Sequence, residues 1–171
     1  MIAPGLASAD GLVPELAREA IELLTATGRT VAVAESLTGG MVAAALTSVA
    51  GSSAAFRGGI VAYATDLKTA LLGVPAELLE LHGPVHPDVA AAMADGVRRR
   101  LGATFGLATT GVAGPGSAGD HPAGTVFVAV CGPSGATGTG FRFAGNRQEV
   151  RDQSVCGVLS LLVSAVREHL A

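Results

Sequence analysis

The sequence has no tryptophan, one tyrosine, one lysine and two cysteines, and only 15% of its 171 residues are charged. Its 11 basic and 14 acidic residues give a net charge of −3, which removes the electrostatic basis for binding nucleic acid or an anionic membrane. No apolar run reaches the roughly 18–20 residues of a membrane span, and no basic region followed by an apolar segment opens the chain. We therefore expect a cytoplasmic protein that acts on a small molecule.

The cysteines and histidines give no indication of a metal site. Cys131 and Cys156 lie in apolar contexts without CxxC spacing, so we expect buried thiols rather than a disulfide. No HExxH motif or spaced set of Cys and His is present. The four histidines are scattered along the chain: His82, His86, His121 and His169. We therefore predict no metal and no cofactor.

Small residues dominate what is present, with 32 alanines and 24 glycines. Short apolar runs alternate with segments of helical periodicity, and a hairpin pattern follows. Helices are expected over residues 13–27, 41–49, 66–72, 75–81, 87–101 and 148–169, and strands over 30–34, 59–64, 105–109, 125–131 and 138–143. This order predicts an α/β fold, a three-layer α/β/α sandwich with a mixed, mostly parallel sheet. We expect one domain over residues 1–171, with its core from about 12 to 170.

The single lysine, Lys68, is the first candidate for chemistry. The chain has ten arginines, which would serve wherever a fixed positive charge was enough. An amine can lose its proton when desolvated and act as a base, whereas a guanidinium cannot. The alternative is a surface lysine paired with Asp66 or Glu77. Thr65 is the expected N-cap of the helix that carries Lys68.

Ser36 is the second candidate, because it lies where a buried strand turns toward a helix. The glycines Gly39 and Gly40 follow it, and backbone N–H groups at such a turn can hold a phosphate or an oxyanion. The alternative is that Ser36 or Thr38 only caps the helix. A Ser–Lys pair is a known way to activate a hydroxyl for acyl transfer or amide hydrolysis.

Two further segments could line the same site. The loop from Thr110 to Gly116 also follows a buried strand, at the end where α/β sheets bind ligands. A GxGxxG match in this loop is followed by a strand instead of a helix, which excludes the dinucleotide fingerprint. Arg147 and Arg151 lie four residues apart and could clamp a phosphate, or they could form a solvated face with Glu149 or Asp152.

Several of these segments, in this order, resemble the CinA C-terminal domain family. The resemblance is carried by the segments Ala34-Glu35-Ser36-Leu37-Thr38-Gly39-Gly40, Gly51-Ser52-Ser53, Tyr63 to Lys68, Leu71 to Val74, Thr110 to Gly116 and Pro122 to Thr125. It implies an α/β/α fold without metal or cofactor and a place in cytoplasmic pyridine nucleotide salvage. Members resemble nicotinamide-nucleotide amidase, an amidohydrolase that converts nicotinamide mononucleotide and water to nicotinate mononucleotide and ammonia.

The resemblance also implies roles for individual residues. It makes Ser36 the nucleophile and Lys68 the base, and it places Tyr63 with them in the catalytic site. The expected substrate-binding residues, from the turn after Ser36 and from the family match, are Glu35, Thr38, Gly39, Gly40, Thr110, Gly111, Ala113, Gly114 and Arg147. A homodimer or higher homo-oligomer is expected as well. The other function left open is a non-catalytic nucleotide-binding or regulatory module of the same family.

The chain departs from the family pattern at a few positions. Leu37 stands where members commonly have Cys, Thr65 where Asn is common, and His86 where Ser is usual; Pro84 and His121 also depart. None of these positions is Ser36 or Lys68. The resemblance therefore defines the reaction class more firmly than the substrate.

Overall fold

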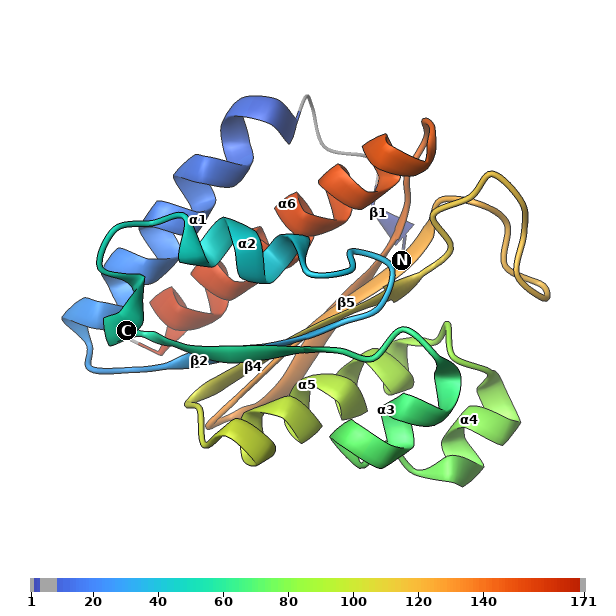
Figure 1. The fold of residues 1–171 in the computed structure, drawn as a ribbon, viewed down its shortest axis with the longest axis horizontal. Helices are drawn as coiled ribbons and strands as arrows, with labels where there is room; N and C mark the ends of the chain where they lie inside the picture. Colours follow the sequence, from blue (N-terminus) through green and yellow to red (C-terminus); the bar gives the residue numbers. More distant parts are fainter. Residues whose placement is uncertain (1, 4–8, 170–171) are drawn as a thin grey trace.

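A six-stranded sheet runs through the middle of the computed structural model, which describes residues 2–3 and 9–169 (Figure 1). The strands are β1 (Ile2–Ala3), β2 (Val31–Glu35), β3 (Phe56–Val61), β4 (Phe105–Gly111), β5 (Thr125–Gly132) and β6 (Gly135–Arg142), in the order β1-β6-β5-β4-β2-β3. β2 pairs in parallel with β3 and β4, and β1 with β6, whereas β5 is antiparallel to both neighbours. The predicted mixed sheet is confirmed.

Helices cover both faces of this sheet and complete the three predicted layers (Figure 1). One face carries α1 (Ala9–Ala26), α2 (Met41–Thr47) and α6 (Arg147–Glu168), and the other carries α3 (Thr65–Leu72), α4 (Ala76–His82) and α5 (Pro87–Leu101). A short 3₁₀ turn, η1 (Ser52–Ala54), precedes β3. Within the described ranges, no helix combines the length and the apolar character needed to cross a membrane.

Small residues allow α5 to lie very close to the sheet. Both faces of β2 are buried, and its side chains alternate between them. Val31 and Val33 belong to the core under α1 and α6, whereas Ala32 and Ala34 face α5. On β4, a Cβ at Gly106 would meet the Ala94 carbonyl oxygen of α5 at 2.0 Å. Alanine and glycine residues therefore lie where the backbone of a helix approaches the sheet closely and larger side chains would not fit.

The same close approach makes Gly96 of α5 sensitive to substitution. A Cβ there would meet the Leu72 carbonyl oxygen at 1.9 Å. We expect Gly96→Ala to lower the free energy of unfolding by about 2 kcal/mol or more, although Ala is the better helix former. Gly11→Ala in α1 is the matched control, because no atom of the described residues lies within 4 Å of its added Cβ; it should raise the stability by up to about 1 kcal/mol. Urea unfolding measures both, and an unchanged midpoint for Gly96→Ala would contradict the packing of α3 on α5.

Two local predictions around β3 differ from the structure. The strand runs from Phe56 to Val61 rather than over 59–64, because the chain leaves the sheet once the Ala62 N–H has bonded to the Glu35 carbonyl. Thr65 was expected to cap the next helix and does not. Ala64 is the N-cap of α3, with no side-chain cap bond, and Thr65 is the first helical residue.

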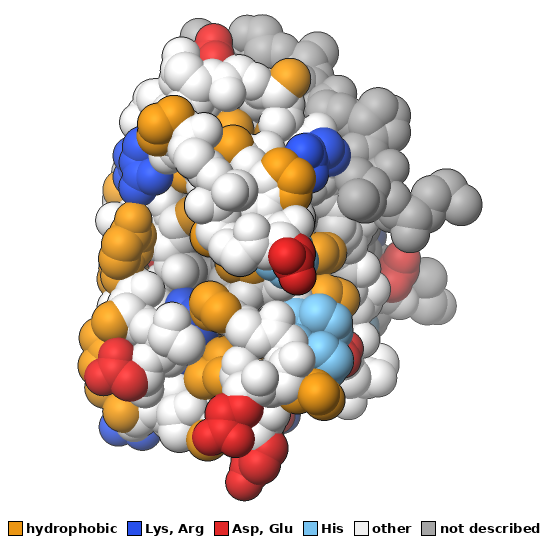
Figure 2. Space-filling model, turned by 90° about the vertical axis from the view of Figure 1, so that its right-hand side faces the viewer, with side chains coloured by type: hydrophobic (Ala, Val, Ile, Leu, Met, Phe, Trp, Pro, Cys, Tyr) orange, Lys and Arg blue, Asp and Glu red, His pale blue; other side chains and the backbone are white. Residues whose placement is uncertain are grey.

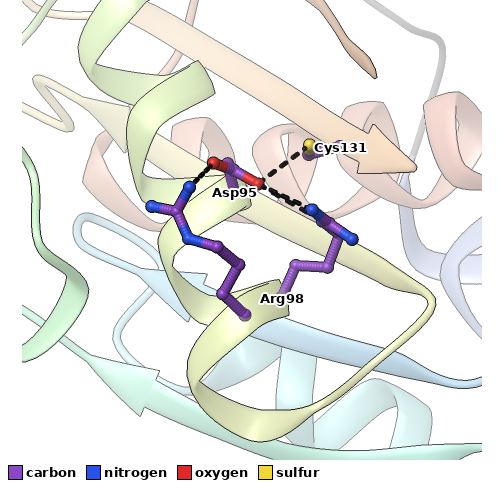
Figure 3. A network of polar contacts seen from close by, with 4 residues as sticks. Asp95, Arg98 and Cys131 are labelled. Carbon is purple, nitrogen blue, oxygen red and sulfur yellow. Dashed lines mark hydrogen bonds and ion pairs between the residues drawn. The ribbon is translucent and has the colours of Figure 1, made fainter. Parts of the chain in front are cut away.

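Both cysteines are buried free thiols, as predicted. The Cys131 sulfur lies 3.5 Å from the Asp95 carboxylate, which also binds the guanidinium groups of Arg98 and Arg99 (Figure 3). Burial, followed by the charge of Asp95, raises the pKa of the Cys131 thiol. The raised pKa disfavours the thiolate form of Cys131, and the Asp95 carboxylate neutralises part of the positive charge that Arg98, Arg99 and Arg100 place at the end of α5.

Candidate active site

Three parallel strands end at one edge of the sheet and gather the candidate residues there. The register pairs Glu35 of β2 with Val61 of β3 and with Thr109 of β4. Ser36 comes directly after β2, and its N–H donates to the Thr109 carbonyl at 3.1 Å. Carboxyl ends of parallel strands are where α/β sheets bind ligands. Figure 2 looks onto this end of the molecule.

Lys68 reaches this edge from α3 and contacts Ser36 directly. Its Nζ donates to Ser36 Oγ at 3.0 Å and to the Ala62 carbonyl at 2.7 Å. The side chain is only 1% exposed. The expected alternative, a surface pair with Asp66 or Glu77, is wrong, because the ammonium is turned inward onto two neutral oxygens.

The surroundings of Lys68 shift its protonation equilibrium toward the uncharged form. In the described part of the chain, no carboxylate lies within ion-pair distance of Nζ. Burial lowers the pKa of Lys68 from 10.5 to about 8, because a desolvated ammonium without a counter-charge is unstable. A neutral amine that can accept the Ser36 proton is therefore available near physiological pH.

A cavity of about 250 Å³ opens above Ser36 and Lys68. Its walls come from the turn after β2, the start of α3, the segment before α5, the loop after β4 and the start of α6. The lining residues are Ser36, Leu37, Tyr63, Thr65, Lys68, Pro84, Val85, Thr110, Gly111, Val112, Ala113, Gly114, Gly116, Ala118 and Arg147. The Ser–Lys pair and the loop after β4 thus face one space, as the sequence predicted.

The loop after β4 is held against the opposite wall by Thr110. Its hydroxyl donates to the Pro84 carbonyl at 2.7 Å. Beside it, Gly111 lies so close to β5 that an added Cβ would meet the Thr125 carbonyl oxygen at 2.6 Å. Both residues therefore shape the cavity through their fixed position.

Tyr63 and Arg147 lie together at the mouth of the cavity. Arg147 donates to the Tyr63 hydroxyl and to the Gly114 carbonyl, both at 2.9 Å. Tyr63 lines the cavity but is 60% exposed, although the resemblance placed it with Ser36 and Lys68 in the catalytic site. Its hydroxyl contacts a cation at the rim instead of the Ser–Lys pair. The Arg147 guanidinium is the cation of α6 that lines the cavity.

Glu35 has a different place from the one expected. Its carboxylate accepts the N–H groups of Gly40, Val42 and Ala43 at 2.9–3.0 Å, and the side chain is 1% exposed. It therefore caps α2 from the preceding strand, and neither Ser36 nor Thr38 acts as the cap. Because the carboxylate occupies the N-terminus of α2, a phosphate cannot be cradled there.

The other turn residues of the predicted site also lie away from the cavity. The Thr38 and Thr109 hydroxyls bond to each other at 2.8 Å beneath the turn. In the residues described, Glu35, Thr38, Gly39 and Gly40 do not line the cavity, and they support the turn that presents Ser36. The N–H of Gly39 is used within the turn, because it donates to the Ser36 carbonyl.

Arg151 does not join Arg147 as a phosphate clamp. Its guanidinium donates to the Leu37 and Thr38 carbonyls, each at 3.0 Å, and to the Gln148 side chain. The alternative of a solvated face with Glu149 or Asp152 is wrong for the same reason. Arg151 thus connects α6 to the turn that carries Ser36, and Arg147 lines the cavity without it.

One cluster was missed by the sequence analysis. His82, at the end of α4, and His86, before α5, have stacked rings with centroids 3.9 Å apart. Together with Asp88, they bring potential metal ligands into one place. The available signal was the four-residue spacing of the two histidines with Asp88 two residues further on. Gly83 and Pro84 interrupt the helix between the two histidines, so this spacing did not suggest that their side chains lie together.

Comparison with known proteins places this geometry in a family. The CinA C-terminal domain model matches residues 13–166. A CinA-like protein of Frankia casuarinae is 52% identical over 82% of this chain, which corresponds to 32% of that protein. One of Anaeromyxobacter dehalogenans is 49% identical over 90% of this chain and 38% of its own length. The chain thus spans about a third of the length of the curated relatives it matches.

Solved structures agree with these sequence matches. The crystal structure of the competence/damage inducible protein CihA from Agrobacterium tumefaciens is 38% identical, has a TM-score of 0.88, and is matched over 95% of this chain and 99% of its own. A CinA superfamily protein from Escherichia coli is 31% identical with a TM-score of 0.89, over 96% and 95% of the two chains. With its family match, relatives and fold in agreement, the chain belongs to the CinA C-terminal domain family.

Proposed function

We propose that this protein is an amidohydrolase that converts nicotinamide mononucleotide and water to nicotinate mononucleotide and ammonia. The observation that carries the proposal is the buried Lys68 amine, 3.0 Å from Ser36 Oγ, at the wall of a small cavity. This pair supplies a nucleophile and a base without a histidine or a metal ligand. The substrate follows from the resemblance of family members to nicotinamide-nucleotide amidase.

The first half of the reaction forms an ester with the enzyme. Neutral Lys68 takes the Ser36 hydroxyl proton while Oγ attacks the carboxamide carbon, and the carbonyl oxygen becomes an oxyanion. The tetrahedral intermediate then breaks its C–N bond, and the proton held by Lys68 passes to the departing nitrogen as ammonia forms. In the second half, Lys68 takes a proton from water, which attacks the ester. The acid leaves, and the proton returns to Ser36 Oγ.

The oxyanion needs donors that no other group already occupies. The Ser36, Gly39 and Gly40 N–H groups donate within the protein, which leaves the N–H groups of Leu37 and Thr38 without an acceptor among the described residues. Leu37 lines the cavity directly after the nucleophile. We assign its N–H to the oxyanion, since a backbone donor beside the nucleophile is fixed in place before the charge develops.

Arg147 is the group proposed to bind the substrate phosphate. It lies at the rim of the cavity, and its side-chain hydrogen bonds within the described ranges go to neutral oxygens, those of Tyr63 and Gly114. An arginine in this setting is free to bind a phosphate through two N–H groups. A nucleotide with its phosphate at Arg147 would then extend its carboxamide toward Ser36. The protein would act in the cytoplasm on this small molecule; self-association as a homodimer or higher homo-oligomer remains an expectation.

The non-catalytic alternative depended on the N-terminus of α2 as a phosphate cradle. The Glu35 carboxylate takes those N–H groups, which removes the expected binding site. A binding module would also have no need for a deprotonatable amine on a serine hydroxyl. The arrangement of Lys68 and Ser36 therefore favours turnover.

The test is to incubate the purified protein with nicotinamide mononucleotide and to measure ammonia and nicotinate mononucleotide together. The proposal expects equal amounts of the two products and none from Ser36→Ala. Ser48→Ala is the matched control, because Ser48 is exposed and its hydroxyl donates to the Ala45 carbonyl of its own helix; it should retain full turnover. Binding of the nucleotide without ammonia release from the unmodified protein would instead support the regulatory module.

A further inference from the structure

The stacked histidines lie outside the catalytic cavity, where α4 ends and α5 begins. The rings of His82 and His86 are nearly parallel, with an interplanar angle of 7°. His86 Nδ1 lies 3.6 Å from a carboxylate oxygen of Asp88, whose side chain is 66% exposed. Histidine side chains form a pale blue group on the face shown in Figure 2. Three ligand-type side chains thus meet at a solvent-accessible place.

The ligand atoms lie close enough together to meet one ion after a local movement of the side chains. One ligand atom from each of His82, His86 and Asp88 lies within 4.8 Å of the other two. Zinc binds histidine nitrogen and carboxylate oxygen at about 2.0–2.2 Å, so two ligands of a tetrahedral ion stand roughly 3.4 Å apart. The 3.6 Å between His86 Nδ1 and the Asp88 oxygen is close to that value.

We propose that His82, His86 and Asp88 bind a divalent transition-metal ion of the zinc type. Two imidazoles and one carboxylate suit such ions, whereas magnesium and calcium prefer oxygen ligands. Among the described residues, the Asp88 carboxylate has no lysine or arginine within ion-pair distance. An ion would therefore meet an uncompensated negative charge.

Binding requires a small local rearrangement. Parallel rings cannot both point a nitrogen at the same ion, so the stack must open by ring rotation. The Asp88 N–H now donates to His86 Nδ1 at 3.3 Å, a long bond that the ion would replace if it used that nitrogen. The three protein ligands leave a fourth position for water, as at other zinc sites with an open position.

The location of the site gives the ion a consequence for the cavity. The segment between the two histidines contains Pro84 and Val85, which line the cavity. The Pro84 carbonyl also accepts the Thr110 hydroxyl at 2.7 Å. An ion held by His82, His86 and Asp88 would tie the end of α4 to the first turn of α5, and it would fix this wall from outside.

The test is a titration of the chelator-treated full chain with Co²⁺ and Zn²⁺. Co²⁺ should give the visible absorption of a tetrahedral site at one equivalent, and calorimetry with Zn²⁺ should give the same stoichiometry. We expect His82→Gln and His86→Asn each to weaken binding at least tenfold. Asparagine is a preferred N-cap, so His86→Asn keeps the cap of α5 and should keep the thermal midpoint.

His121→Gln is the matched control, because His121 is a histidine outside the cluster; its affinity should equal that of the unmodified protein. Equal Zn²⁺ affinity in the unmodified protein and in His82→Gln would overturn the proposal, as would the absence of a one-equivalent phase. A tenfold or greater loss in the two cluster variants alone would support it. The readout is binding, so it does not depend on any amidase activity.

Discussion

Replacing Lys68 with methionine is expected to abolish ammonia release from nicotinamide mononucleotide while leaving the protein folded. Methionine fills a similar volume in the buried position, but it has no amine to accept the Ser36 proton. Removing one member of a nucleophile and base pair typically costs about 10³-fold or more in kcat. Lys68→Arg should fail as well, because a guanidinium does not deprotonate in this pH range.

The matched control is Thr69→Met, an exposed neighbour of Lys68 on α3, which should keep both turnover and stability within about 0.5 kcal/mol. Product formation per enzyme, together with circular dichroism, separates lost chemistry from lost structure. Turnover in Lys68→Met within tenfold of the unmodified protein would assign the base to another group.

The pH dependence follows from the same amine. The pKa of Lys68 is about 8 in the folded protein and 10.5 without burial, so kcat/KM should rise with pH through a limb near 8. Between these two values the unfolded chain binds more protons, and stability contributed by this group rises with pH. The stability of Lys68→Met relative to the unmodified protein should be constant below pH 8 and should fall between pH 8 and 10.5.

The sequence was enough to predict the parts of the site that are marked by a rare residue type or by a position at the end of a parallel strand. Lys68 stood out because arginine replaces lysine everywhere else, and Ser36 because it follows a strand buried on both faces. Parallel strands end at one edge of a sheet, so the segment from Thr110 to Gly116, which is the end of β4 and the loop after it, was expected near both. Residue type and topology were enough for these assignments.

The residues whose side chains turn back on the protein could not be assigned in the same way. Glu35 and Arg151 have the charges expected of ligand-binding groups, yet both side chains form hydrogen bonds with backbone atoms of the protein itself. The Glu35 carboxylate meets N–H groups five to eight residues ahead, and Arg151 meets carbonyls more than a hundred residues away. Such partners depend on rotamers and packing, which a sequence pattern does not specify.

The position of Tyr63 shows the same limit. The resemblance placed Tyr63 with Ser36 and Lys68 in the catalytic site, but Lys68 is buried on α3, whereas Tyr63 is 60% exposed. Tyr63 precedes that helix and meets Arg147 of α6 at the rim. The two ends of this contact are 84 residues apart, and only the three-dimensional structure brings them together.

Glu35→Ala is expected to cause the largest loss of stability of any single substitution near the site. It leaves the N–H groups of Gly40, Val42 and Ala43 without their acceptor, in a place where the removed side chain was 1% exposed. Hydrogen bonds to a charged acceptor contribute about 1.5–3 kcal/mol each, with partial recovery through water. We expect the free energy of unfolding to fall by about 3–5 kcal/mol, measured by urea unfolding.

Two further variants show whether this loss comes from burial of the carboxylate or from capping in general. Glu35→Gln keeps the shape but offers one acceptor oxygen where the carboxylate has two, so it should lose about 1–3 kcal/mol. Glu149→Ala removes a capping carboxylate from the exposed start of α6, where water can replace it, and should cost about 1 kcal/mol. If Glu35→Ala cost no more than Glu149→Ala, the buried carboxylate would not be what holds the turn. A loss several times larger for Glu35→Ala than for Glu149→Ala would show that the buried carboxylate holds the turn between β2 and α2. Because Ser36 lies in that turn, turnover in Glu35→Ala should then fall as well.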